Sequence, residues 1–242
     1  MVVEAPSRRD RVRAATADEI KQTARRILVA EGPKACSLRA IAGEMGMTAP
    51  ALYRYFDGRD DLIKHVAADI FTEIADDIHN AIQAASEASG GDVVAKMVAA
   101  CGEFRRWSLA HKEEFGLLFG TPLPGLEAVH DHVIDDCADK FSGEFLALFL
   151  EVWLKHPFPV PADDEIDPGL REQLARYREL LRVDLPLGAG LTFLRCWVRL
   201  YGMVSLEVFG HLHFALDDAA PMFDITLAEL AALVGLEYPP SR

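Results

Sequence analysis

Side chains that can bind phosphate and read base edges are concentrated in one short stretch of the chain. Tyr53, Tyr55 and Arg59 carry hydroxyl or guanidinium groups, which donate hydrogen bonds to phosphate oxygens. Thr48 and Arg54 carry groups suited to base edges, because a hydroxyl donates or accepts and a guanidinium can address guanine. The combination indicates contact with a nucleic acid duplex, and the alternative is that these aromatic residues only pack on a surface.

The residues around this stretch predict two short helices joined by a glycine turn. Ser37 can cap the first helix, and Thr48 can cap the second, in whose first turn Pro50 is tolerated. Gly46 can adopt the left-handed conformation that ends the first helix. The first helix has one apolar face, made by Leu38, Ile41, Ala42 and Met45. Two such helices form a helix-turn-helix, whose second helix enters the major groove of DNA.

This geometry assigns the candidate DNA-binding residues to two groups. Leu52 and Phe56, four residues apart, are expected to face the core. The Ala49 and Pro50 carbons can meet a thymine methyl group. The residues expected to contact phosphate or the groove edge are Ser37, Arg39, Tyr53, Tyr55 and Arg59, and the expected base readers are Thr48, Ala49, Pro50 and Arg54.

The charge distribution supports a nucleic acid partner only at the N-terminal end. The whole chain of 242 residues has a net charge of −13. Residues 1–65 hold 12 Lys and Arg against 9 Asp and Glu, a net charge of +3, whereas residues 66–242 have a net charge of −16. The basic end should face DNA and the acidic remainder should face away from it. Arg8, Arg9, Arg11 and Arg13 are expected in a weakly structured N-terminal arm. The arm either follows the phosphate backbone or enters a minor groove, or it is a disordered, solvated tail.

Residues 14–62 resemble the N-terminal domain of the TetR family of one-component bacterial transcriptional regulators. The resemblance is carried by Ile41-Ala42, Gly46, the run Leu52-Tyr53-Arg54-Tyr55-Phe56, Arg59 and Leu62. Two residues depart from the family pattern, because Tyr55 stands where the family usually has histidine and Arg59 where it usually has lysine. Both side chains still donate hydrogen bonds to phosphate.

The segment Trp197–Glu207 is similar to the one that gives a TetR C-terminal subfamily its Trp-His-Gly label. Tyr201 replaces the histidine, so a role specific to an imidazole is not implied. The resemblance implies a homodimer that binds a DNA operator and a small-molecule effector.

Helical patterns cover the rest of the chain and predict an all-α fold. Leu62, Val66, Ile70, Ile74, Ile78 and Ile82 follow at four-residue steps in a long helix that opens near Arg59. Other helices are expected at about 17–31, 92–110, 112–120, 125–153, 169–183, 187–213 and 221–235, with an exposed loop at 154–168. We expect a DNA-binding domain at 14–74, with its motif at about 37–56, and an effector-binding and dimerisation domain at 75–242.

Two apolar helix faces near the C-terminus are open to two interpretations. They are formed by Trp197, Tyr201, Val204, Val208 and Leu212, and by Phe223, Leu227, Leu230 and Val234. The faces are either core within one chain or the two-fold interface of a four-helix bundle. We favour the dimer, because one helix-turn-helix covers only half of a palindromic operator.

The large apolar residues of the middle of the chain are first of all core. A helical domain of this size can also enclose a cavity, and in the family such a cavity usually takes the effector. The residues that we expect to line it are Trp107, Phe115, Phe145 and Trp197.

Other chemistries find little support in the sequence. Cys36, Cys101, Cys137 and Cys196 are widely spaced, which indicates reduced thiols in a cytoplasmic protein. His132 and Asp136 form one metal-compatible helical pair, whereas His211-x-His213 places its two rings on different helix faces. Neither is a complete site, so no metal or cofactor is expected. No signal peptide and no membrane-spanning run is expected.

Together with the resemblance to the TetR family, these patterns predict a homodimeric repressor, not an enzyme, that a small molecule releases from its operator. The alternative is a helical enzyme or ligand carrier with a vestigial DNA-binding unit. The basic N-terminal end and the phosphate-contact residues argue against that alternative.

Overall fold

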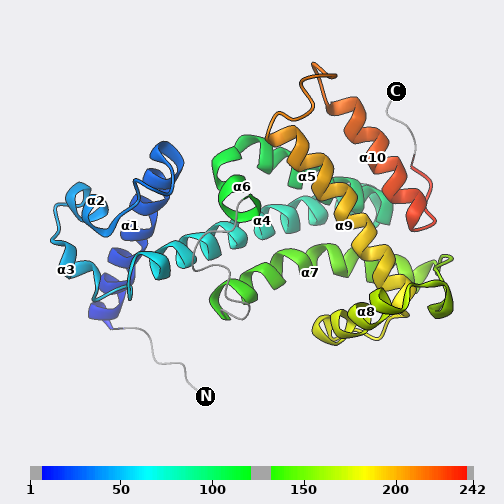
Figure 1. Cartoon of the computed structure of the whole chain (residues 1–242), viewed down its shortest axis with the longest axis horizontal. Coiled ribbons are helices and arrows are strands. Elements are labelled where there is room, and N and C mark those ends of the chain that lie inside the picture. The colour runs from blue at the N-terminus through cyan, green and yellow to red at the C-terminus, as the bar shows by residue number, and fades with distance from the viewer. Residues whose placement is uncertain (1–6, 121–131, 239–242) are drawn as a thin grey trace. The chain divides into compact units, whose positions relative to one another are not determined.

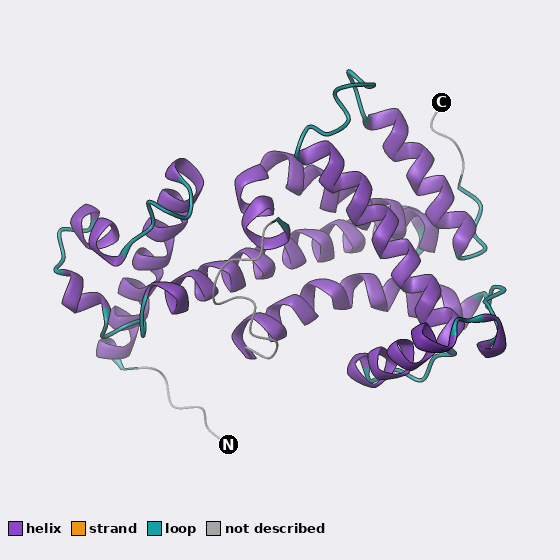
Figure 2. Cartoon of the chain, viewed as in Figure 1, coloured by secondary structure: helices purple, strands orange, loops and turns teal. Residues whose placement is uncertain are grey.

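The computed structural model describes residues 7–120 and 132–238. Every regular element in these ranges is helical, as the sequence predicts (Figure 2). The α-helices are α1 (Arg8–Glu31), α2 (Leu38–Glu44), α3 (Ala49–Leu52), α4 (Arg59–Ser89), α5 (Val93–Ala110), α6 (Lys112–Phe119), α7 (His132–Lys155), α8 (Pro168–Leu181), α9 (Leu187–Val208) and α10 (Ala220–Leu233). A single 3-10 turn, η1 (Asp163–Glu165), lies in the predicted loop at 154–168. No helix in the described ranges has the length and apolarity to cross a lipid bilayer.

The chain divides into two compact units. The described residues up to Ile74 and those of the segment Glu113–Phe141 form the N-terminal unit. Residues Ala75–Lys112 and the described residues from Ser142 onward form the C-terminal unit. The predicted boundary after residue 74 coincides with the end of the first segment, but the prediction left 113–141 in the second domain.

The N-terminal unit has a core built from one face of each of its helices. Ile20 and Ile27 of α1, Ile41 of α2 and Leu52 of α3 are buried, as are Leu62, Val66 and Ile70 of α4. The segment from α6 adds aromatic packing, because the Phe71 ring meets the Phe119 ring edge-on with 5.6 Å between centroids. The four-residue steps of α4 are confirmed, since every member from Leu62 to Ile82 is buried.

The C-terminal unit is organised around α9, which contacts α5, α8 and α10 (Figure 1). Arg105 of α5 forms two hydrogen bonds to Glu207 of α9, at 2.7 and 2.5 Å. The same guanidinium lies over the Phe223 ring of α10, 5.1 Å from its centroid. One arginine therefore joins three helices that are far apart in the sequence.

Candidate DNA interface and effector cavity

Two short helices joined by a glycine turn are present, as the sequence predicts, but the second helix, α3, is shorter than expected and ends at Leu52. Ser37 caps α2 by accepting a hydrogen bond from the Ala40 backbone N–H at 3.2 Å. Gly46 has a φ of 64°, in the left-handed region, so the prediction for this turn is confirmed. Leu52 and Phe56 are buried, as expected.

The outer surface of α3 and the turn after it carry the predicted DNA-binding residues. Thr48, Pro50, Tyr53 and Arg54 are exposed, and the Tyr53 side chain has an exposed fraction of 60%. Arg39 of α2 is also exposed, whereas Ser37, Ala49 and Tyr55 are partly buried. These side chains can reach a duplex, and their contacts with DNA stay a prediction.

Thr48 differs in one respect from its expected role. It occupies the N-cap position of α3, but its side chain makes no capping hydrogen bond. Its hydroxyl is not committed to holding the helix start, which suits a group that addresses a base edge.

The prediction of a weakly structured N-terminal arm is wrong, because the four arginines lie in helix α1. Helix α1 begins at Arg8, because Ser7 and Asp10 form a capping box in which each side chain bonds the backbone N–H of the other. Arg13 donates a hydrogen bond to the Arg54 carbonyl at 3.1 Å, which ties α1 to the end of the reading segment. Arg8, Arg9 and Arg11 are exposed on the first turns of α1.

Arg59 has a role within the chain that the sequence analysis did not assign. Its guanidinium donates hydrogen bonds to the carbonyls of Cys36, at 2.6 Å, and Pro33, at 2.5 Å, and it pairs with Asp60 at 3.0 Å. These bonds hold the loop that leads into Ser37 and α2 against the start of α4. Any phosphate contact by Arg59 stays a prediction.

We expect Arg59→Ala to lower the free energy of unfolding by about 1–2 kcal/mol, because two carbonyls lose a charged donor. Chemical denaturation followed by circular dichroism measures this change. Arg54→Ala serves as the control and should change stability by less than about 0.5 kcal/mol, since its side chain is exposed. Equal stabilities of the two variants would show that the Arg59 bonds contribute nothing to the fold.

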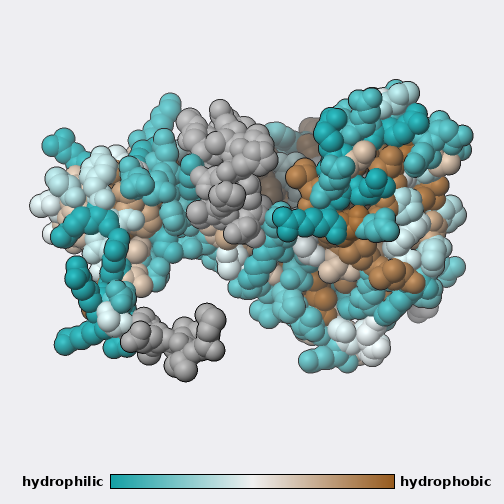
Figure 3. Space-filling view, turned by 90° about the horizontal axis from the view of Figure 1, so that it is seen from below, coloured by the Kyte–Doolittle hydropathy of each residue, from teal (hydrophilic) through white to brown (hydrophobic). Residues whose placement is uncertain are grey.

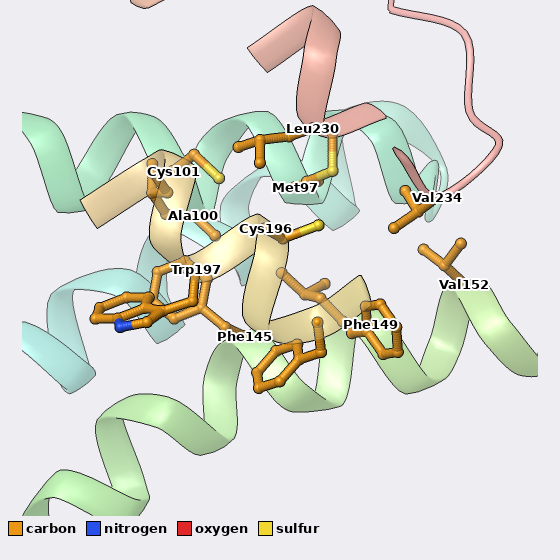
Figure 4. Close-up of a pocket in the computed structure, with 13 residues that line it drawn as sticks. Met97, Ala100, Cys101, Phe145, Phe149, Val152, Cys196, Trp197, Leu230 and Val234 are labelled. Atoms are coloured by element: carbon orange, nitrogen blue, oxygen red, sulfur yellow. The ribbon is translucent and has the colours of Figure 1, made fainter. Parts of the chain in front are cut away.

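The C-terminal unit contains an apolar cavity of about 70 Å³ between four helices (Figure 4). The lining residues are Met97, Ala100 and Cys101 from α5, Phe145, Leu148, Phe149 and Val152 from α7, Phe193, Cys196, Trp197 and Leu200 from α9, and Leu230 and Val234 from α10 and its end.

Two of the four aromatic residues predicted to line an effector cavity lie in the wall of this apolar cavity. Its use by an effector stays a prediction. Phe145 and Trp197 face each other in the cavity, with 6.1 Å between ring centroids. Trp107 does not line it, because its ring is buried and stacks on His111 with 4.7 Å between centroids. Phe115 lies in the N-terminal unit and packs on Phe119.

The sequence analysis missed the sulfur-containing members of the cavity. Met97 and Cys101 are one helical turn apart on α5, and Cys196 precedes Trp197 on α9. Their helical spacing was visible in the sequence, but nothing there marked them as facing a cavity instead of solid core.

Most of the predicted dimer stripe packs within one chain, whereas Trp197, Tyr201 and Leu212 are partly buried. The pairing of these two helices with a second copy stays a prediction. Val204 and Val208 of α9 and Phe223, Leu227, Leu230 and Val234 of α10 are all buried within one chain. A different apolar face of the same two helices is exposed, formed by Val198, Leu206, Phe209, Met222 and Ile225. We call these five residues the outer face. Apolar residues also gather on the part of this unit seen at the right of Figure 3.

Gly202 lies on α9 between Val198 and Leu206 of the outer face. A Cβ atom built on it would meet no atom within 4 Å. The backbone is therefore open to close approach by another helix at this point.

Metal chemistry gains no support from the described residues, which contain no cluster of three or more His, Cys, Asp or Glu side chains suited to a metal ion. His211 and His213 are exposed. The side chains of His132 and Asp136 lie outside the part of the chain that the structure describes.

Two family models match this chain. The model described as bacterial regulatory proteins, tetR family, matches residues 20–66, which include α2 and α3. The model described as tetracyclin repressor-like, C-terminal domain, matches residues 97–230. The second match includes most of the residues that line the cavity.

Relatives and solved structures resemble the chain over most of its length. HTH-type transcriptional regulators Rv1816 of Mycobacterium tuberculosis and Mb1846 of Mycobacterium bovis are each 28% identical over 221 residues, 89% of this chain and 91% of the relative. The crystal structure of the regulatory protein SCO4313 is 32% identical, with a TM-score of 0.69, covering 94% of this chain and 100% of that one. The TetR family regulator PfmR from Thermus thermophilus shares the fold, with a TM-score of 0.51 at 12% identity over 91% of this chain and 99% of that one.

Proposed function

Because this chain belongs to the TetR family of bacterial regulatory proteins and is a DNA-binding transcriptional regulator, we propose that it is a homodimeric repressor. A small molecule that enters the C-terminal unit releases it from a palindromic operator. We assign DNA binding to residues 14–74 and effector binding and dimerisation to 75–242. The protein acts in the cytoplasm and has no catalytic role.

The strongest support for DNA binding is the solvent exposure of residues at α3 and in the turn after it. Exposed Thr48, Pro50 and Arg54 stand over a buried Leu52, so the reading surface is held by the core of its own unit. Phosphate contacts from Tyr53 and Tyr55 fix the position of the protein along the duplex, and base contacts give the preference for a DNA sequence.

The outer face supports the homodimer. Val198 and Ile225 have exposed fractions of 66% and 53%, on two helices that contact each other within the chain. A two-fold partner would cover both helices in a four-helix bundle, with Gly202 allowing close approach. Two copies then present their reading segments to half-sites about 34–36 Å apart, one turn of B-DNA.

The effector acts by population shift in this proposal. The cavity is lined by α5, α7, α9 and α10, so an occupant contacts all four helices at once. The dimer has one geometry that spans two half-sites and another that does not. An effector that binds the second geometry more tightly weakens DNA binding, and the difference between its affinities for the two geometries limits how much.

Selection of bound duplexes from a random-sequence library tests the function directly. The expected product is a palindrome, bound with an affinity that falls steeply as salt rises. Enrichment of no sequence, together with a flat salt dependence, would contradict the proposal.

Single substitutions then separate phosphate contacts from base contacts. Tyr55→Ala should weaken binding to all duplexes by about 10-fold, the equivalent of one lost contact of about 1.4 kcal/mol. Arg54→Ala should instead change the preferred base at one position of each half-site, with a discrimination of about 1–3 kcal/mol lost. Gel shifts on the selected duplex and its single-base variants measure both effects. The assignment fails if both variants bind the whole panel like the parent protein.

A further inference from the structure

The chemistry of the cavity lining restricts what can occupy it. None of the thirteen lining side chains is charged and none carries a hydroxyl, carboxylate or amide group. Their heteroatoms are the thioether of Met97, the thiols of Cys101 and Cys196 and the indole nitrogen of Trp197. Figure 4 draws that nitrogen on the side of the ring away from the two thiols.

The two thiols supply no charge to the cavity. Burial, with a smaller contribution from nearby Cys196, raises the pKa of the Cys101 thiol to about 12. Burial also raises the pKa of Cys196, to about 11, although Arg199 and Arg195 lower it. Both groups are therefore neutral thiols near pH 7, so the cavity offers no ion as a partner for a charged ligand.

This apolar lining makes it costly for a charged ligand to enter the cavity. A carboxylate, phosphate or ammonium group that entered would lose its water and gain no hydrogen-bond partner of comparable strength. An apolar ligand loses nothing of this kind and removes its own surface from water. The lining therefore selects against charged ligands.

The volume sets the scale of the ligand. Apolar cavities of about 150 Å³ in proteins stay dry and bind benzene. At about 70 Å³ the cavity is smaller than that, so a benzene-sized molecule must widen it. Phe145 and Trp197 form part of the wall, with their rings tilted against each other, so a change of rotamer at either residue would alter the volume.

We propose that the effector of this regulator is a small, uncharged, apolar molecule, aromatic or aliphatic, held in the cavity between α5, α7, α9 and α10. The proposal rests on the function proposed above and adds the chemical class of the ligand.

Three probes of one size and different charge test the class: toluene, benzoate and benzylammonium. Each is added to the full-length protein at equal concentration, and binding is measured by the shift in melting temperature and by Trp fluorescence. Toluene should raise the melting temperature and change the fluorescence, and the two ions should do neither. Binding of benzoate or benzylammonium as tight as that of toluene would overturn the proposal, and so would the absence of toluene binding.

Substitutions locate the bound probe. Ala100→Leu adds three carbons at a buried position of the wall and should weaken toluene binding by at least about 10-fold. Ala147→Leu makes the same change at an exposed position of α7 and should leave the affinity within about two-fold of the parent. The melting temperature without ligand shows that each variant is folded. Equal toluene affinity in both variants would place the probe elsewhere and overturn the assignment to this cavity.

A gel shift on the selected duplex separates failure of this inference from failure of the proposed function. Release of the duplex by toluene, but not by the two ions, supports both. Tight duplex binding by a protein that ignores toluene overturns the ligand class and leaves the regulator intact. A protein that binds toluene but selects no duplex overturns the proposed function alone.

Discussion

The double variant Val198→Glu, Ile225→Glu is expected to be monomeric and to bind the operator about 100-fold more weakly or worse. Both side chains are more than half exposed in the single chain, so the substitutions should leave its fold intact. In a two-fold bundle the same positions are covered by the partner, and four carboxylates would have to be buried close together without partners. A monomer holds one half-site only and loses the gain of linked binding, which reaches about 10²–10⁴-fold.

Light scattering coupled to size-exclusion chromatography measures the mass, and a gel shift measures the affinity. The matched control is Leu154→Glu, Leu180→Glu, which changes the net charge by the same amount at two exposed leucines of α7 and α8. The control separates loss of the dimer from repulsion between added carboxylates and DNA. A variant that stays dimeric and binds like this control would show that the subunits associate through another surface.

This interface also shows where the sequence was insufficient. Helix α9 is apolar on more than one side, so periodicity identified a helix but could not rank its faces. Val204 and Val208 pack within the chain, whereas Val198 and Leu206 remain outside. Which apolar face meets the core depends on neighbours α5 and α10, which are distant in the sequence.

Features that depend on residues close together in the sequence were predicted better than this interface. The register of α4 follows from isoleucine, leucine and valine at four-residue steps, because the opposite face of that helix is polar. The turn at Gly46 follows from the need for a left-handed backbone conformation. Helix α1 was predicted to begin near residue 17, just before the apolar face that starts at Ile20, yet the Ser7 and Asp10 capping pair starts it at Arg8.

The cavity could be expected but not mapped. Phe145 and Trp107 have the same kind of spacing in their helices, and only the packing of four helices leaves one at the cavity wall and the other buried against His111. Arg59 illustrates the same limit for polar groups. Its type and position suit a phosphate contact, but the nearby carbonyls of Pro33 and Cys36 bind its guanidinium.

Arg25→Met is expected to lower the free energy of unfolding by about 2 kcal/mol. Arg25 of α1 forms two hydrogen bonds to Glu73 of α4, at 2.6 and 3.2 Å, and two at 3.3 Å to one Glu114 oxygen of α6. The Glu114 side chain has an exposed fraction of only 10%, so the variant leaves a nearly buried carboxylate without this partner. Removing one member of a fully buried pair costs about 3–5 kcal/mol, and the partial exposure of Arg25 and Glu73 reduces that cost.

A second substitution distinguishes an isolated charge from lost packing. Methionine retains most of the arginine stem, so the apolar contacts of Arg25 are largely kept. If the buried charge of Glu114 is the cause, Glu114→Gln in the Arg25→Met background should recover about half of the loss, because a neutral amide costs less to bury than a carboxylate. Chemical denaturation followed by circular dichroism, over the full double-mutant cycle, measures the coupling between the two residues. Additive effects of the two substitutions would mean that Arg25 and Glu114 stabilise the N-terminal unit independently, so that no ion pair between them holds α6 to α1.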